Sequence, residues 1–126
     1  MTPPPNPEIA LERAREALVE ARDNTKLGHH RAAINRAYYA TLYASLALLK
    51  SIGVDAKTHD GVHGLVAQHF VRAGSLDAGT SRMLKHLAAD RDLADYDFST
   101  TMSESDAAEA IADAAAYVEA VTRLLA

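Results

Sequence analysis

The sequence predicts an all-α protein, an antiparallel four-helix bundle with one additional short helix. In four long segments the apolar residues recur at spacings of three and four, no stretch alternates with the period of two that marks a strand, and glycines or polar clusters separate the segments. With 126 residues, 48% hydrophobic and 24% charged, the chain has the size and composition of one packed domain. We expect that domain at residues 8–126, after a flexible Pro-rich N-terminus at residues 1–7.

The first two helices are expected on either side of a break at Gly28. Asn6 suits the N-cap of the first helix and Pro7 its first position, and the helix should continue to about Lys26. Its apolar stripe is Leu11, Ala14, Leu18 and Ala21. The second helix, at roughly residues 30–51, is apolar around most of its circumference and should therefore occupy the middle of the bundle.

Three further helices follow. Thr58 is a suitable cap for a short helix that continues to Val71 and closes at Gly74. A fourth helix is expected from about Ser75 or Asp77 to Tyr96, with its inward residues Met83, Leu84, Leu87 and Leu93. Ser103 and Asp106 resemble a capping box that opens an Ala-rich last helix ending at Leu125.

Composition and charge exclude several classes of function. Without cysteine, the chain has no disulfide, thiolate metal site or cysteine nucleophile. The longest nearly unbroken apolar run, residues 37–49, is too short to span a bilayer, and we expect a cytoplasmic protein without membrane contacts. The net charge of −4 disfavours non-specific nucleic-acid binding, so any RNA contact must be local. The basic candidates around one helix junction are Arg22, Lys26, His29, His30, Arg31 and Arg36.

The histidines do not predict a metal site. His59 and His63 are four residues apart, superficially like the HExxH helix of zinc proteases. That motif needs a glutamate base and a third ligand, whereas this segment has Asp60 and a helix-weakening Gly61. We therefore read His63 as a surface histidine. No cofactor-binding motif is present either, since no Gly-rich loop follows a strand.

The stretch "NRAYYATLYAS" places a charge in the most apolar helix. Burying Arg36 costs several kcal/mol unless it is paired or faces a cleft. The residues favour a buried ion pair with Asp95 of the fourth helix. They leave open a second interpretation, in which Arg36 and Arg91 line one polar cleft.

The stretch "RDLADYDF" sets Arg91 among acidic residues. Arg91 and Asp95 are four residues apart, which suits an ion pair along a helix surface worth a few tenths of a kcal/mol. Arg91 and Tyr96 also lie near the expected end of the helix, where polar groups are available to a partner. Both a surface pair and a functional cleft are compatible with this spacing.

Five segments in the same order and spacing resemble the HEPN (higher eukaryotes and prokaryotes nucleotide-binding) domain family. They are "NRAYYATLYASLALL", Gly53, "THDGV", "FVRAG" and "RDLADYDF", within a similarity that covers about residues 9–125. The resemblance implies an antiparallel helical bundle that dimerises. No single segment is specific, but the set of five is.

Many HEPN proteins are metal-independent endoribonucleases, whose motif is an arginine followed four to six residues later by a histidine. The arginine binds a phosphate and the histidine activates or positions the RNA 2′-hydroxyl. The resemblance places Arg91 at the arginine position. The candidates for the histidine position are Tyr96, Asp97 and Phe98, and none of them is histidine. With the resemblance, a functional cleft around Arg91 is favoured over a surface pair. This sequence resembles the branch with Arg-x-x-x-Asp-Tyr, in which the motif does not establish activity. His59 is a candidate to approach the cleft in place of the histidine.

The resemblance also implies a partner. Such proteins are often encoded beside a minimal nucleotidyltransferase, forming toxin–antitoxin pairs in which a tyrosine near the motif can be adenylylated; here that position is Tyr96. The resulting hypothesis is a homodimeric, RNA-targeting toxin with Arg91, Asp95 and Tyr96 at the catalytic site and Asn35, Arg36, Tyr39 and His59 binding substrate. The alternative is a non-catalytic module that binds a nucleotide or the nucleotidyltransferase. A third interpretation is a purely structural bundle held by an Arg36–Asp95 pair.

Overall fold

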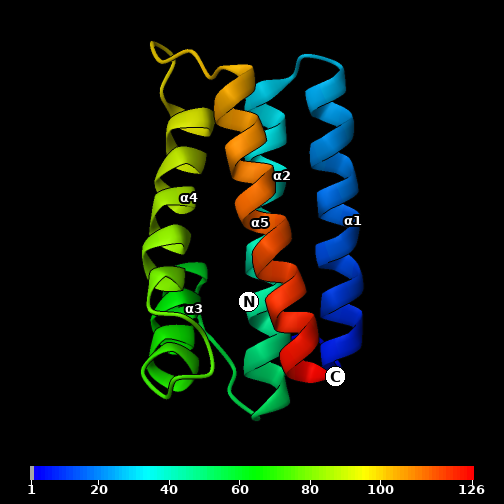
Figure 1. Ribbon diagram of the computed structural model, residues 1–126, viewed down its shortest axis with the longest axis vertical. Coiled ribbons are helices and arrows are strands. Elements are labelled where there is room, and N and C mark those ends of the chain that lie inside the picture. Colours follow the sequence, from blue (N-terminus) through cyan, green and yellow to red (C-terminus); the bar gives the residue numbers. More distant parts are fainter. Residues whose placement is uncertain (1) are drawn as a thin grey trace.

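The computed structural model describes residues 2–126, and all the secondary-structure elements in this range are helices. The elements are α1 (Pro7–Lys26), α2 (His30–Ser51), α3 (His59–Val66), the π-helical turn η1 (Ala67–Val71), α4 (Gly79–Tyr96) and α5 (Glu104–Leu125). The long helices α1, α2, α4 and α5 alternate in direction, and α3 lies with α4 on the side of the bundle away from α1 (Figure 1). The predicted fold class is confirmed.

The central helix is α2, which packs against all four other helices. Small residues make this possible, because alanines are fully buried at five positions of α2 and at α1 positions that meet it. A buried hydrogen bond of 2.7 Å joins Ser45 of α2 to Tyr117 of α5. Burial raises the pKa of the Tyr117 hydroxyl, so this group stays protonated and hydrogen-bonded in the core.

The helix starts follow the local sequence signals. Asn6 accepts a hydrogen bond from the Ile9 amide at 3.0 Å, with Pro7 at the first helical position. Thr58 accepts one from the Gly61 amide at 3.1 Å. Ser103 and Asp106 form the expected capping box. These three predicted caps are confirmed.

Two predicted helices differ in detail. The short third helix continues to Val71, but its last turn widens into a π-turn, and this turn brings Phe70 and Val71 against the core. The fourth helix begins at Gly79, two residues after Asp77, the later of its two expected starts. The Asp77 carboxylate closes a turn there by accepting a hydrogen bond from the Gly79 amide. The inward position predicted for Leu93 is wrong, since its side chain is 41% exposed and Ala94 is buried instead. Across residues 2–126, none of the helices combines the length and apolar character needed to cross a membrane.

Candidate functional site

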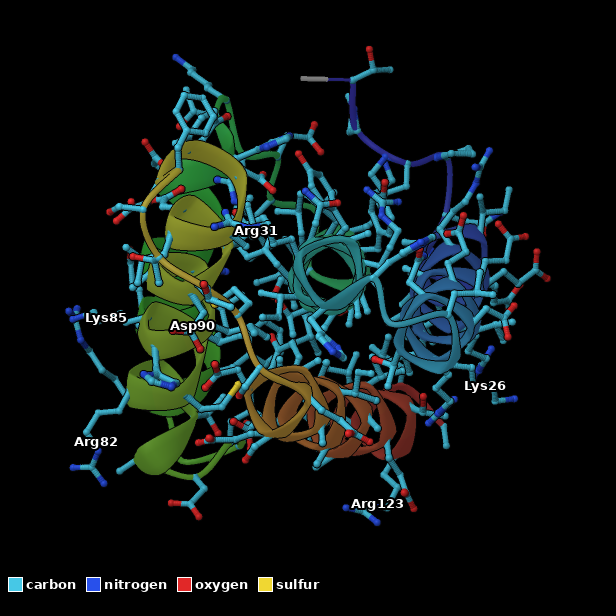
Figure 2. The ribbon with its side chains drawn as sticks, turned by 90° about the horizontal axis from the view of Figure 1, so that it is seen from above. Lys26, Arg31, Arg82, Lys85, Asp90 and Arg123 are labelled. Carbon is cyan, nitrogen blue, oxygen red and sulfur yellow. The ribbon has the colours of Figure 1, made fainter. Side chains whose placement is uncertain are left out.

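The end of α4 is fixed by an arginine from α2. Arg31 donates hydrogen bonds to the carbonyl oxygens of Leu93 (3.2 Å) and Ala94 (2.6 Å), which lie in the last turn of α4. It also donates to the carbonyl oxygen of Thr100 in the following loop. Figure 2 shows Arg31 directed from α2 toward this end of α4. Arg31 therefore binds carbonyl groups at the end of α4 and in the loop that follows it.

Arg91 is held on the inner side of α4. Its side chain is 17% exposed and forms ion pairs with Asp92 (3.2 Å) and Asp95 (3.6 Å). Its guanidinium carbon lies 4.6 Å from the centre of the Tyr38 ring and 6.0 Å from that of Tyr96. Desolvation works against the charge, but the neighbouring tyrosines and acids outweigh it and raise the pKa of Arg91. The predicted pair between Arg91 and Asp95 is confirmed, and Arg91 stays cationic.

The buried ion pair expected between Arg36 and Asp95 is wrong. Arg36 is 29% exposed and lies 3.8 Å from Glu20 of α1, while its Nε and Nη2 donate to the Asn35 side-chain oxygen. The Asn35 side-chain nitrogen donates to the Asp95 carboxylate at 3.0 Å. Asn35 thus separates the two charged groups and connects them through one amide. The order of side chains along this polar network is Glu20, Arg36, Asn35, Asp95, Arg91 and Asp92.

An open cavity of about 980 Å³ lies where α3 and α4 meet α2. Its lining includes Tyr38, His59, His63 and Arg91, with charged groups from Asp60, Arg72, Lys85 and Asp92. Arg36, Asn35, Tyr39, Asp95 and Tyr96 lie outside its lining. Arg36 and Arg91 therefore do not line one cleft, although the polar network connects them.

His63 is not the surface histidine that the sequence indicated. Its Nε2 atom is buried and has no hydrogen-bond partner among residues 2–126. Its ring meets the Tyr38 ring nearly at right angles, with 6.1 Å between centres. Burial lowers the pKa of His63 from its usual 6.5, opposed in part by Asp60. The imidazole is therefore neutral at neutral pH and can accept a proton.

The other predicted substrate-binding residues form a strip along α2 outside the cavity. The Arg36 guanidinium lies 4.8 Å from the centre of the Tyr39 ring. The Tyr39 ring meets the ring of His59, which is exposed at the start of α3, with 6.1 Å between centres. His59 belongs both to this strip and to the cavity lining. The strip therefore leads from Arg36 to the mouth of the cavity.

Tyr96 lies on the outer surface. Its side chain is 70% exposed and that of Phe98 is 96% exposed. Both line a shallow hollow that shares Ala89 and Asp92 with the cavity of Arg91. In the loop that follows, Asp97 accepts hydrogen bonds from Ser99 and Thr100, which lower the pKa of its carboxyl to about 2.

The structure brings four predicted residues into one network, Asn35, Arg36, Arg91 and Asp95, and places Tyr96 apart from the cavity. Tyr38 was not predicted from the sequence, His63 was taken for a surface histidine, and Arg31 was not assigned to the end of α4. A signal for Tyr38 was available, because Asn35 and Tyr38 share one face of α2, and Asp95 and Arg91 share one face of an antiparallel helix. Once Asn35 meets Asp95, Tyr38 must lie near Arg91. Within residues 2–126 no group of three or more histidine and acidic side chains is placed to hold a metal ion.

Comparisons with known proteins give relatives over most of the chain. A model of the HEPN domain matches residues 7–124. A "UPF0332 protein" from Thermotoga maritima is 28% identical over 118 residues, which are 94% of this chain and 89% of that protein. One of the same name from Archaeoglobus fulgidus is 26% identical over 112 residues, 89% of each chain. A Methanocaldococcus jannaschii protein named "Putative toxin MJ0142" is 26% identical over 100 residues, 79% of this chain and 68% of that protein.

Proposed function

Because this chain belongs to the HEPN domain family, we propose that it is the RNA-targeting toxin of a pair whose antitoxin is a minimal nucleotidyltransferase. The Methanocaldococcus relative carries the word toxin in its name, which supports the toxin part of this proposal. In the proposed function the protein acts in the cytoplasm as a homodimer. It cleaves RNA by a mechanism that needs no metal ion.

The observation that carries the proposal is the setting of Arg91. Stacking on Tyr38 at 4.6 Å and pairing with two aspartates fix the guanidinium on the wall of an open cavity. A guanidinium has five N–H donors, so the two ion pairs leave donors for a phosphate. A pre-positioned arginine can bind a phosphodiester and stabilise the charge that develops during its cleavage.

The remaining residues have supporting roles in this proposal. Asn35 and Asp95 hold Arg91 in register with α2, through a hydrogen bond of 3.0 Å and an ion pair of 3.6 Å. The strip of Arg36, Tyr39 and His59 offers a cation and aromatic faces beside the cavity. Single-stranded RNA binds such surfaces by stacking its bases on aromatic rings and pairing its phosphates with arginine.

A second candidate function is a non-catalytic module that binds a nucleotide or the nucleotidyltransferase. The exposure of Tyr96 favours it, because at 70% exposure its hydroxyl is accessible to a modifying partner. Tyr96 also stands where the ribonuclease motif of the family has a histidine. A stable complex with the nucleotidyltransferase in a protein that cleaves no RNA would favour this module over the ribonuclease.

Expression in growing cells tests the toxin directly. Arg91→Ala should abolish growth arrest, since it removes the phosphate-binding group, whereas Arg82→Ala should leave it unchanged. Arg82 is a matched control because it projects from the outer face of the same helix, as Figure 2 shows. Circular dichroism of both purified variants establishes that they are folded. Growth arrest by a folded Arg91→Ala protein would refute the proposed role of Arg91.

A further inference from the structure

His63 is a histidine that the family resemblance leaves without a role. It lies in α3, one helical turn after His59, and it lines the same cavity as Arg91. Its Nε2 atom is buried without a hydrogen-bond partner among residues 2–126. Buried polar side-chain atoms are nearly always hydrogen-bonded, so an unpaired one in a residue that lines a cavity suggests a ligand or a catalytic use.

His63 and Arg91 both pack against the ring of Tyr38. The Arg91 guanidinium lies over the Tyr38 ring at 4.6 Å, and the His63 ring meets that ring nearly at right angles at 6.1 Å. Because Arg91 and His63 both pack on the Tyr38 ring, their side chains are held at a fixed distance from each other. The Nε atom of Arg91 is also buried without a partner in the described part of the chain. The cavity therefore holds an anion-binding group and a proton-accepting group together.

Other candidates for the proton acceptor fit less well. Tyr96 lies outside the cavity lining and is 70% exposed, and a tyrosine with an ordinary pKa near 10 is a poor base at neutral pH. His59 is exposed at the cavity mouth and packs against Tyr39 instead of Tyr38. Among the described residues, only His63 combines a buried unpaired nitrogen with a position beside the ring that supports Arg91.

We propose that His63 is the proton-accepting residue of this cavity, in place of the histidine that the sequence lacks after Arg91; the inference rests on the ribonuclease function proposed above. The substrate is a phosphodiester of single-stranded RNA. Arg91 binds its non-bridging oxygens and His63 faces the adjacent 2′-hydroxyl.

The reaction requires no oxidant, cofactor or metal. The imidazole of His63 accepts the proton of the 2′-hydroxyl, and the 2′-oxygen attacks the phosphorus. The bond from phosphorus to the 5′-oxygen breaks, leaving a 2′,3′-cyclic phosphate on one fragment. The departing 5′-oxygen takes a proton from water to become a hydroxyl, and His63 returns its proton to the solvent. Arg91 offsets the negative charge that develops on the phosphate oxygens.

The surroundings of His63 predict the pH dependence of this step. The titratable and charged groups that share the cavity with it are Tyr38 of α2, His59 and Asp60 of α3, Arg72 after η1, and Lys85, Arg91 and Asp92 of α4. Burial is the largest influence and lowers the pKa of His63 from 6.5. A base must be unprotonated to act, so the cleavage rate should rise with pH through the lowered pKa and be level at pH 7 and above.

The test compares RNA cleavage by the wild type, His63→Gln and the control His86→Gln. His86 is on α4 but outside the cavity lining, paired with Asp90 at 3.3 Å, so the control removes a histidine without touching the cavity. General-base catalysis contributes roughly 100- to 10,000-fold, so His63→Gln should lose at least about 100-fold in rate. His86→Gln should retain the wild-type rate. His63→Ala should regain activity when free imidazole is added, which a purely structural role would not produce.

Each outcome separates the inference from the proposed function. Cleavage by the wild type and by a folded His63→Gln variant at similar rates overturns the role of His63 and leaves the ribonuclease standing. Absence of cleavage by the wild type overturns the ribonuclease and this inference with it. If His63→Gln does not fold, the wild-type pH profile decides, because a cleavage rate that does not fall as the pH is lowered from 7 excludes a histidine base.

Discussion

Replacing Arg31 with methionine should loosen the helix end that carries the candidate site. The variant keeps an apolar stem of similar length but removes the donors that bind the carbonyls of Leu93, Ala94 and Thr100. The carbonyl of exposed Leu93 can be rehydrated, whereas Ala94 is only 4% exposed. The loss of stability should therefore come mainly from the hydrogen bonds to Ala94 and Thr100.

The expected magnitude follows from these bonds. Hydrogen bonds to a charged group contribute roughly 1.5–3 kcal/mol each when partly buried, and rehydration offsets a part of this. We expect a loss of about 2–3 kcal/mol in the free energy of unfolding. For a domain of this size, that corresponds to a fall in Tm of roughly 6–15 °C.

Urea denaturation followed by circular dichroism gives the change in free energy, with an unchanged m-value as a check that the unfolding transition is the same. Hydrogen exchange shows where in the structure the stability is lost. The Asp97 amide donates to the Leu93 carbonyl at 3.1 Å and should lose protection selectively. Arg22→Met on the exposed face of α1 is the control. A loss below about 0.5 kcal/mol, no larger than that of an ordinary surface substitution, would refute the capping role of Arg31.

Three further predictions concern the stability of the bundle. Ser45→Ala should cost about 1–3 kcal/mol, because the buried Tyr117 hydroxyl loses its 2.7 Å partner; adding Tyr117→Phe should restore most of the loss, and additive costs in the double-mutant cycle would contradict the bond. Burial and then Glu109 raise the pKa of Asp113, so its carboxylate costs stability at pH 7 and this cost disappears as the pH falls through the folded pKa. Asp113→Asn should therefore raise Tm slightly at pH 7 and have less effect near pH 3, and an equal effect at both would be inconsistent with that origin. The pKa of Asp97 is lowered from 3.8 to about 2, so its stabilising effect is present above about pH 4 and lost between pH 4 and 2; in Asp97→Asn, the Tm should fall less steeply over that range than in the wild type.

The helices were predictable because their signals are local. Asn6, Thr58 and Ser103 accept amide hydrogen bonds within three residues, so sequence spacing alone identifies them as caps. The error at Leu93 is also local in origin. Leu84, Leu87 and Ala94 lie on the buried stripe of α4, and Leu93 is one residue, about 100° of helix rotation, away from it. The small side chain of Ala94 occupies the buried position, whereas the larger apolar side chain of Leu93 was predicted to be there.

The candidate site was less predictable because it depends on how helices are placed relative to one another. The pairing of Arg36 with Glu20 instead of Asp95 follows from the relative register of α1, α2 and α4, which the spacing of residues within one helix does not determine. The burial of His63 likewise depends on α3 packing against α2 and α4. Arg91 and Asp95 were identified correctly as a pair because both lie on α4, one turn apart.

Incubation of the purified protein with labelled single-stranded RNA in EDTA, beside its Arg91→Ala variant, is the decisive experiment for the proposed ribonuclease. The wild type should cleave the RNA without metal and leave 2′,3′-cyclic phosphate ends, while Arg91→Ala should be at least about 100-fold slower. Equal cleavage by both proteins would show that Arg91 has no part in the reaction. Intact RNA with both proteins would contradict the ribonuclease and favour the nucleotide- or nucleotidyltransferase-binding module.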